Sequence, residues 1–257
     1  MLHGKHRVQI SLTKLLTVLQ LTPSKLRRLL LTIVSVLLLF HFFVLFLRFG
    51  IGDGFAEWIV IMFCFDDERN VPTLYSASVI LFCSVMLLKT SRLQNQHTSG
   101  LTFYWKALAI VMFFLFMDEA FSVHEIANGP RFRHLWPDGN GYFHFAWVFP
   151  YLFLVFVVGM FFIRFLFRLP AATRNQYVIA GCMYVAGALG LELIGGKYKD
   201  MHSADLGYYL IITVEELMEM LAMIIFLNGT LRYYMAFQER SELQLRFTLT
   251  ADSVRNR

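Results

Sequence analysis

The stretch that decides the fold is Leu29 to Phe49, LLLTIVSVLLLFHFFVLFLRF, where His41 and Arg48 are the only ionisable residues. Crossing about 30 Å of hydrocarbon takes roughly 20 apolar residues in a helix, so this stretch is long enough to span a membrane. Five more stretches come close to the same length and composition: 72–90, 105–124, 145–167, 176–196 and 207–228. The sequence therefore predicts an all-α, polytopic membrane helix bundle of about six transmembrane helices.

The overall composition favours the bilayer as the solvent of this chain. Of the 257 residues, 57% are hydrophobic and 27 are phenylalanine, which is more apolar surface than a soluble domain of this size can bury. The net charge of +5 is explained by basic residues that flank apolar runs, as membrane topology requires. We therefore expect the lipid bilayer as a partner and no nucleic acid. The three cysteines have no metal-type spacing, and no disulfide framework is expected.

The distribution of basic residues predicts the orientation. With the N-terminus placed inside, 17 of the 23 Lys and Arg residues fall on the inner side, which favours cytoplasmic termini at both ends. We divide the chain into a cytoplasmic N-terminal segment, a transmembrane bundle and a cytoplasmic C-terminal tail, at 1–28, 29–230 and 231–257. Residues 8–20 are predicted to form a short amphipathic helix on the membrane surface, and Thr22-Pro23 to start the next helix. The fragment 55–65 is too short to cross and is placed in the interface.

Acidic residues gather on the opposite side. Fifteen of the 18 Asp and Glu residues lie in predicted outer loops or within spans, although acidic residues contribute little to orientation. An ionisable group inside a span costs about 2.5–3.5 kcal/mol on insertion scales, so such groups usually have a function. This asymmetry points to a function that faces outward.

The third predicted span ends in a polar sequence, M-D-E-A-F-S-V-H-E at residues 117–125. If the helix continues through it, Asp118 and Glu125 share one face with Ser122 between them, and Glu119 and His124 point to either side. One helix face is thus expected to present two carboxylates and a hydroxyl. The alternative is that these acids lie in the headgroup region and pair with basic residues: Arg131, Arg133 or Lys197.

The fifth and sixth predicted spans carry four more acidic residues. Glu215, Glu216 and Glu219 fall within about 100° of one another, so all three are expected to face one bundle interior. Glu192 lies near the outer end of the fifth span, among small residues that let helices approach closely. The alternative is a structural role, in which these carboxyl groups are protonated or hydrogen-bonded inside the bundle.

The three acidic sets lie toward one side of the predicted bundle, where histidines join them. A cluster of carboxylates and imidazoles suits Zn, Fe or Mn, or a proton relay. The Glu-x-x-His motif of di-iron bundles is missing, because Glu216 is followed at that spacing by Glu219. The candidate metal ligands are Asp118, Glu119, His124, Glu125, His144, Glu192, Glu215, Glu216 and Glu219.

Two stretches carry a family resemblance. Asp66 to Ser76 has the pattern D-x-E-x-N-V-P-T-x-Y-S, and Met117 to Glu125 has M-D-E-A-x-S-V-H-E. Both resemble motifs of a group of uncharacterised bacterial multi-pass membrane proteins. The resemblance implies the six-span layout and a bacterial inner-membrane location, and it transfers no activity. In the first motif Asn70 and Pro72 suit the cap and first turn of a helix, whereas a functional alternative places residues 66–68 at the mouth of the acidic site.

Three classes of function remain open. The leading hypothesis is an outward-facing site that binds a metal or other cation, which includes metal-dependent chemistry on a lipid or small substrate. The first alternative is a structural or accessory subunit, with a membrane-protein partner or as a homo-oligomer. The second is a proton- or cation-coupled transporter, ranked lower because few polar groups lie between the acids and the cytoplasm. No phosphate loop, nucleophile elbow, dinucleotide fingerprint or zinc-protease motif is present, so the sequence does not decide whether the protein is an enzyme.

Overall fold

The computed structural model describes residues 22–51, 57–97, 100–124, 126 and 147–255. In chain order the elements are α2 (Pro23–Phe46), the π-helix η1 (Leu47–Ile51), α3 (Glu57–Phe63), α4 (Val71–His97), α5 (Thr102–Phe121), α7 (Val148–Arg168), α8 (Ala171–Val185), the π-helix η4 (Ala186–Leu191), α9 (Glu192–His202) and α10 (Leu206–Arg255). Strands are absent from these described residues. The prediction of an all-α helical bundle is confirmed.

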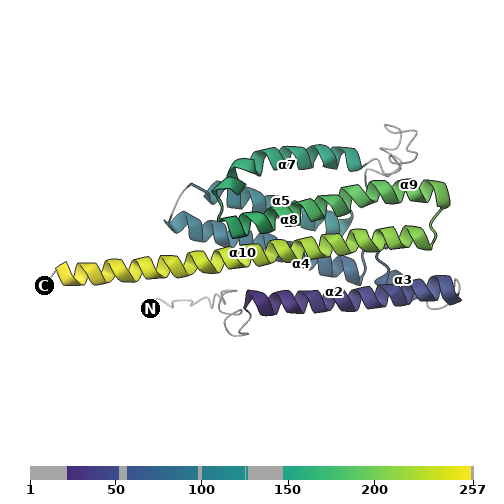
Figure 1. Cartoon of the computed structure of the whole chain (residues 1–257), viewed down its shortest axis with the longest axis horizontal. Coiled ribbons are helices and arrows are strands. Elements are labelled where there is room, and N and C mark those ends of the chain that lie inside the picture. The colour runs from purple at the N-terminus through teal and green to yellow at the C-terminus, as the bar shows by residue number, and fades with distance from the viewer. Residues whose placement is uncertain (1–21, 52–56, 98–99, 125, 127–146, 256–257) are drawn as a thin grey trace, which may run out of the picture.

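The long helices are roughly parallel to one another, and the chain runs in opposite directions in successive helices (Figure 1). After α2 the chain returns through α4, and the alternation continues through α5, α7, the continuous α8–η4–α9 segment and α10. The start of α2 and the end of α10 therefore lie at the same end of the bundle. Because α10 contacts α2, α4, α8, η4 and α9, it is the central helix.

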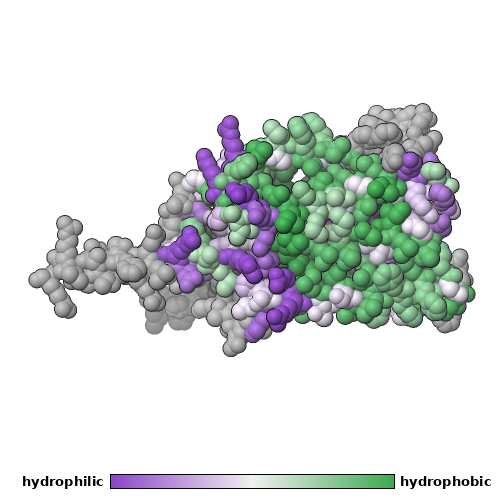
Figure 2. All heavy atoms as spheres, in the orientation of Figure 1, coloured by the Kyte–Doolittle hydropathy of each residue, from purple (hydrophilic) through white to green (hydrophobic). Residues whose placement is uncertain are grey.

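Four of the described helical segments are long and apolar enough to cross a membrane: Pro23–Ile51, Val71–Asn95, Pro150–Arg168 and Ala171–His202. Figure 2 shows a broad hydrophobic surface, with hydrophilic residues gathered on one side of it, where α5 begins and α7 ends, and on the other side near the end of α9. The chain is therefore a membrane protein. The other two predicted spans correspond to α5 and α10, which carry acidic residues within the same bundle, and their crossing of the membrane stays a prediction.

Two predicted helix starts are confirmed by their capping chemistry. Thr22 caps α2 through its side-chain oxygen, and Pro23 occupies the first helical turn, where a missing N–H costs nothing. Asn70 caps α4, since its Oδ1 accepts a hydrogen bond of 3.1 Å from the backbone of Thr73. Its amide also donates to the carbonyl of Cys64 at 2.6 Å, which ties the end of α3 to the start of α4.

The predicted boundary between the bundle and the C-terminal tail falls within one helix, and the division itself stays a prediction. The predicted tail begins at residue 231, but α10 continues without a break to Arg255. The predicted amphipathic helix at 8–20 lies outside the described residues. The fragment predicted to stay in the interface contains α3, a helix of seven residues that is too short to cross.

His41 links three elements in the core. Its side chain is fully buried, with Nδ1 accepting from the Phe65 backbone at 3.1 Å and Nε2 lying 2.9 Å from the hydroxyl of Thr213. Because Nδ1 accepts, the neutral ring donates from Nε2. This node holds the connection between α3 and α4 against α2 and α10, and so places residues 66–68 beside the start of α10.

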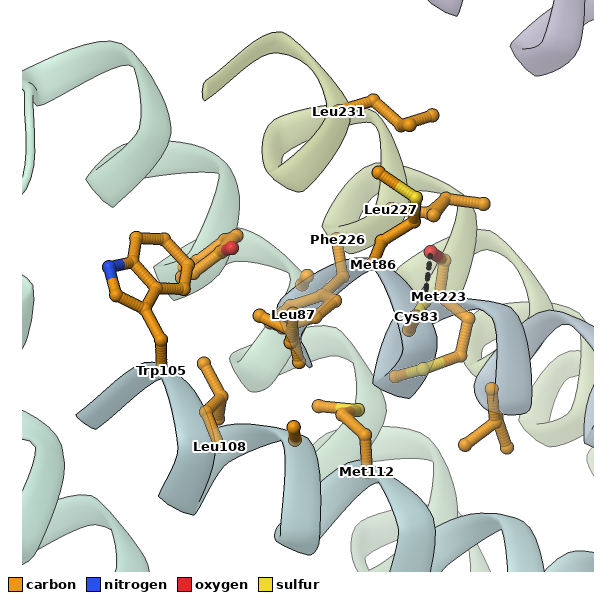
Figure 3. Close-up of a cluster of buried hydrophobic side chains, with 14 of the residues drawn as sticks. Cys83, Met86, Leu87, Trp105, Leu108, Met112, Met223, Phe226, Leu227 and Leu231 are labelled. Carbon is orange, nitrogen blue, oxygen red and sulfur yellow. Dashed lines mark hydrogen bonds between the residues drawn. The ribbon is translucent and has the colours of Figure 1, made fainter. Parts of the chain in front are cut away.

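A hydrophobic cluster fills the bundle between α4, α5 and α10 (Figure 3). Trp105 from α5 is fully buried, and the thiol of Cys83 lies 3.9 Å from the carbonyl of Met223. The labelled members are Cys83, Met86, Leu87, Trp105, Leu108, Met112, Met223, Phe226, Leu227 and Leu231. This packing fixes α5 against α10, and therefore the relative positions of the acidic residues that both helices carry.

Candidate functional site

A cavity of roughly 1210 Å³ lies between α5, α7, the α8–η4–α9 segment and α10. One end is lined by acidic residues and tyrosines, and the rest by apolar side chains of α5, α7, α8 and α10. The cavity is therefore amphipathic, with its polar end near the end of α5 and the start of α10.

Of the glutamates that line the polar end, five belong to helices, and we call them the carboxylate cluster: Glu119, Glu192, Glu215, Glu216 and Glu219. They come from α5, from the first residue of α9 and from α10. Glu216 lies close enough to interact electrostatically with Glu219, Glu119 and Glu192. The prediction that the three glutamates of α10 face one interior is confirmed, and the structure brings the acids of the fifth and third predicted spans to the same place.

Two members of the carboxylate cluster touch directly. The side chains of Glu192 and Glu215 are within hydrogen-bonding reach of each other. Two carboxylates approach this closely only if they share a proton or a cation. Glu215 is only 7% exposed, and its Oε2 has no hydrogen-bond partner within the described part of the chain. A neighbouring tyrosine, Tyr184 of α8, hydrogen-bonds Glu219.

The π-helix η4 brings Glu192 against α10. A Cβ added at Gly187 would lie 3.1 Å from the carbonyl oxygen of Glu215 and 3.2 Å from Cγ of Glu219. A Cβ at these distances would require the backbone of α10 to shift, so the glycine favours the close packing of η4 on the acidic turn of α10. Single-turn π-helices are frequent at functional sites because they shift the register of the side chains that follow.

A second polar group lies beside the carboxylate cluster, and we call it the His124 clamp: Glu68, Asp118 and His124. His124 Nε2 lies 3.3 Å from Glu68 Oε1, and its Nδ1 lies 3.4 Å from Asp118 Oδ1. Asp118 also accepts hydrogen bonds of 2.8 Å from the backbone of His124 and from the hydroxyl of Tyr151. The hydroxyl of Ser122 donates to Glu68. The clamp therefore joins the two motifs that carry the family resemblance.

Charge pairing dominates the titration of the clamp residues that lie outside the helices. Burial by itself lowers the pKa of His124, but the hydrogen bonds to Asp118 and Glu68 outweigh burial and raise this pKa from 6.5 to about 11. Burial raises the pKa of Glu68, yet the hydrogen bonds from His124 and Ser122 outweigh it and hold the pKa below its usual 4.5. His124 is thus an imidazolium with both ring nitrogens engaged by carboxylates.

One sequence-based expectation at this site is wrong. The prediction that Asp118 and Glu125 share one helix face requires a helix that continues through Glu125. Instead, α5 ends at Phe121, and its C-cap residue Ser122 has a left-handed φ of 52°. The chain then turns back, which is why His124 meets Asp118 instead of pointing to the side. Asp118 and Glu119 lie within α5 and point in different directions, so Asp118 belongs to the clamp and Glu119 to the carboxylate cluster.

Two of the nine candidate ligands, Glu125 and His144, lie outside the described residues. Sequence reasoning missed the tyrosines that complete the polar end, namely Tyr151, Tyr184 and Tyr208. The hydroxyl of Tyr208 donates to Asp66 at 2.8 Å, so the first motif also borders the cavity. Tyrosines within apolar helices resemble ordinary packing residues in a sequence, and no spacing rule marks these three.

The donor chemistry of the polar end is dominated by oxygen. No three of the described His, Cys, Asp and Glu side chains are already arranged around one point as a metal site. The carboxylate cluster nevertheless offers ten carboxylate oxygens on flexible side chains, whereas both nitrogens of His124 are engaged in the clamp. Such a donor set suits hard cations, and it can also hold shared protons.

Comparisons with known proteins give one match. Residues 28–233 match the family described as "Domain of unknown function (DUF8692)". No curated protein and no solved structure matches the chain. The matched range runs from the first residues of α2 to the middle of α10, and it includes every described residue of the carboxylate cluster and of the His124 clamp.

Proposed function

Because this chain belongs to the DUF8692 family, whose description states no activity, we propose a function from the site alone: the protein binds a divalent cation in its carboxylate cluster. The observation that carries the proposal is the convergence of five glutamates from three helices at one end of a cavity within the bundle. Each ionised group there costs several kcal/mol in a membrane, and a bound cation offsets that cost for several carboxylates at once.

The ligands that we propose are Glu119, Glu216 and Glu219, with Glu192 and Glu215 close by. These three interact electrostatically with one another across α5 and α10. Flexible glutamates can close around an ion without movement of the helices. Among the metals predicted from the sequence, oxygen donors favour Mn²⁺ over Zn²⁺ or Fe²⁺, and they equally suit Mg²⁺ and Ca²⁺.

The orientation that we propose places this site toward the outside of the bacterial inner membrane. Basic residues cluster at the opposite end of the bundle, at the start of α2, the end of α4 and the end of α7. The positive-inside rule supports this end as the cytoplasmic one. The hydrophobic cluster of Figure 3 lies between the two ends, which supports a static site over a transport path.

The proposal is tested by elemental analysis of the purified full chain after incubation with Mn²⁺, Mg²⁺ and Ca²⁺ in turn. We expect stoichiometric retention of one of these ions, together with a higher melting temperature, since an ion that binds only the folded state stabilises it. The variants Glu216→Gln and Glu219→Gln, which keep shape and remove charge, are expected to lose the ion.

The matched control is Glu57→Gln, because Glu57 is an exposed glutamate of α3 that does not line the cavity. It is expected to retain the ion. A wild-type protein that retains none of the three ions and melts at the same temperature with and without them would overturn cation binding. That result favours carboxyl groups that share protons.

A further inference from the structure

The apolar part of the cavity, which we call the apolar arm, runs between α7 and α8. Its floor is formed by Met223 and Phe226 of α10, which are 4% and 5% exposed. Its walls include Val158, Gly159 and Phe162 of α7, and Val178, Gly181 and Cys182 of α8. The arm is continuous with the carboxylate cluster, because both belong to one cavity.

The apolar arm opens sideways, through the wall that α7 and α8 form. α7 packs on the bundle near its start, through Trp147 and Val148 against Leu189, and near its end, through Phe162 and Phe165. Around Gly159 of α7 and Gly181 of α8 the two helices leave open space. A Cβ added at Gly159 or at Gly181 would meet no atom within 4 Å.

The residues at this opening face the hydrocarbon of the bilayer. Val178 is 45% exposed, and Gly181 and Cys182 are exposed as well, although all three line the cavity. Exposure of several neighbouring wall residues indicates that the cavity reaches the surface here. Since α8 is part of an apolar segment long enough to span a membrane, this surface meets lipid chains and not water.

We propose that the cavity binds a lipid-like amphiphile, with a hydrocarbon chain in the apolar arm and the oxygen atoms of a phosphate head at the cation in the carboxylate cluster. The position of the head rests on the proposed function, because five glutamates without a cation repel a phosphate. The position of the chain rests on the cavity alone. A volume of roughly 1210 Å³ exceeds the range of about 300–1,000 Å³ that is usual for ligand sites, so there is room for a chain and a head together.

The test uses the full chain in phosphatidylethanolamine vesicles that contain a phosphatidylglycerol with a diazirine on its acyl chain. After irradiation, peptide mass spectrometry locates the labelled residues. We expect label on Met223 and Phe226, which bulk lipid cannot reach because both are buried beneath α7 and α8. Phe153 and Met160, which are exposed on α7 outside the cavity, report labelling by surrounding lipid.

The double variant Gly159→Leu/Gly181→Leu fills the apolar arm from both sides, where the structure has space for the added atoms. It is expected to lose the label on Met223 and Phe226 and to keep the label on Phe153 and Met160. Ala172→Leu introduces a leucine at an exposed site of α8 that does not line the cavity, and its labelling is expected to match that of the wild type.

Measurement of bound metal on the same samples separates the two proposals. If Met223 and Phe226 are not labelled in the wild-type protein, the proposal that the cavity binds an amphiphile is wrong. The proposal is also wrong if the double variant has the wild-type melting temperature and Met223 and Phe226 are still labelled. If the buried residues are labelled and the protein holds no metal, the chain site stands while the head contact and the proposed cation fail. If metal is bound and the buried residues stay unlabelled, the cation stands and the amphiphile fails.

Discussion

At the level of single residues, His124 determines how two distant motifs meet. It lies between Glu68 and Asp118, and its ring packs against Trp147 with 4.9 Å between ring centroids. Both neighbours are carboxylates, so the clamp depends on the positive charge of the imidazolium. The charge states of these groups therefore control the junction between the α3–α4 connection and the end of α5.

The stabilising effect of this clamp depends on pH in a defined direction. The folded pKa of His124 is raised from 6.5 to about 11, so its contribution is complete below about 6.5 and is lost as pH rises toward 11. The folded pKa of Glu68 is lowered, so its contribution is present above about 4.5 and is lost as pH falls below that value. We expect the melting temperature of His124→Gln to fall furthest below that of the wild type between about pH 4.5 and 6.5.

The measurement is thermal unfolding in detergent over a pH series, with His202→Gln as the control. His202 is an exposed histidine of α9 that packs on Tyr198, away from the clamp. Its substitution is expected to leave the pH dependence unchanged. A gap between wild type and His124→Gln that widens as pH rises from 7 to 10 would contradict the imidazolium clamp.

The residues of the polar end were predictable to different degrees. Glutamates in apolar helices stand out because a charge in a membrane is costly, and helical periodicity correctly grouped Glu215, Glu216 and Glu219. The role of His124 was not predictable from the sequence. A left-handed residue at the end of a helix is usually a glycine, whereas here it is Ser122. The separation of Glu119 from Asp118 was predictable, because consecutive residues of a helix point about 100° apart.

At the level of elements, η4 and α10 pack closely against each other beside the site. Gly187 of η4 lies so close to α10 that a Cβ would press on the backbone of Glu215, whereas Gly190 of the same π-helix has no atom within 4 Å of such a Cβ. The sequence predicted close helix approach from the small residues of this segment. It did not predict a π-helix, because no residue pattern distinguishes the wider turn from an α-helix.

These two glycines provide a matched pair of substitutions. Gly187→Ala is expected to lower the free energy of unfolding by about 1–3 kcal/mol, because an overpacked contact with backbone cannot relax by a side-chain rotation. Gly190→Ala is expected to be neutral or stabilising, because alanine has a higher helix propensity and meets open space. Chemical denaturation of the two variants in detergent measures the difference, and equal losses would show that η4 does not pack as described.

At the level of the whole molecule, the number of helices was predictable and the division of the chain was less so. Apolar length alone indicated each long helix, since α2, α4, α5, α7, the α8–η4–α9 segment and α10 all fall on predicted spans. The full length of α10 was not predictable from apolar length, because polar residues after residue 230 continue the helix as readily as apolar ones. The predicted start of a cytoplasmic tail at residue 231 stays a prediction.

The orientation that we propose predicts which surfaces are accessible from each side of the membrane. In a Cys182→Ser background, the remaining native cysteines, Cys64 and Cys83, are buried. Ala204→Cys, in the connection before α10, is expected to react with a membrane-impermeant maleimide on intact cells. Gly100→Cys, between α4 and α5, is expected to react only after lysis. The reverse pattern would invert the bundle and place the carboxylate cluster on the cytoplasmic side.

The continuous helix α10 gives the molecule a mechanical property. It carries three glutamates of the site in its first turns and extends past the rest of the bundle at the other end, over 50 residues or roughly 75 Å (Figure 1). A continuous hydrogen-bonded helix of this kind resists stretching. The three glutamates and Arg255 therefore belong to one mechanical element, with no loop between the buried site and the far end of the molecule.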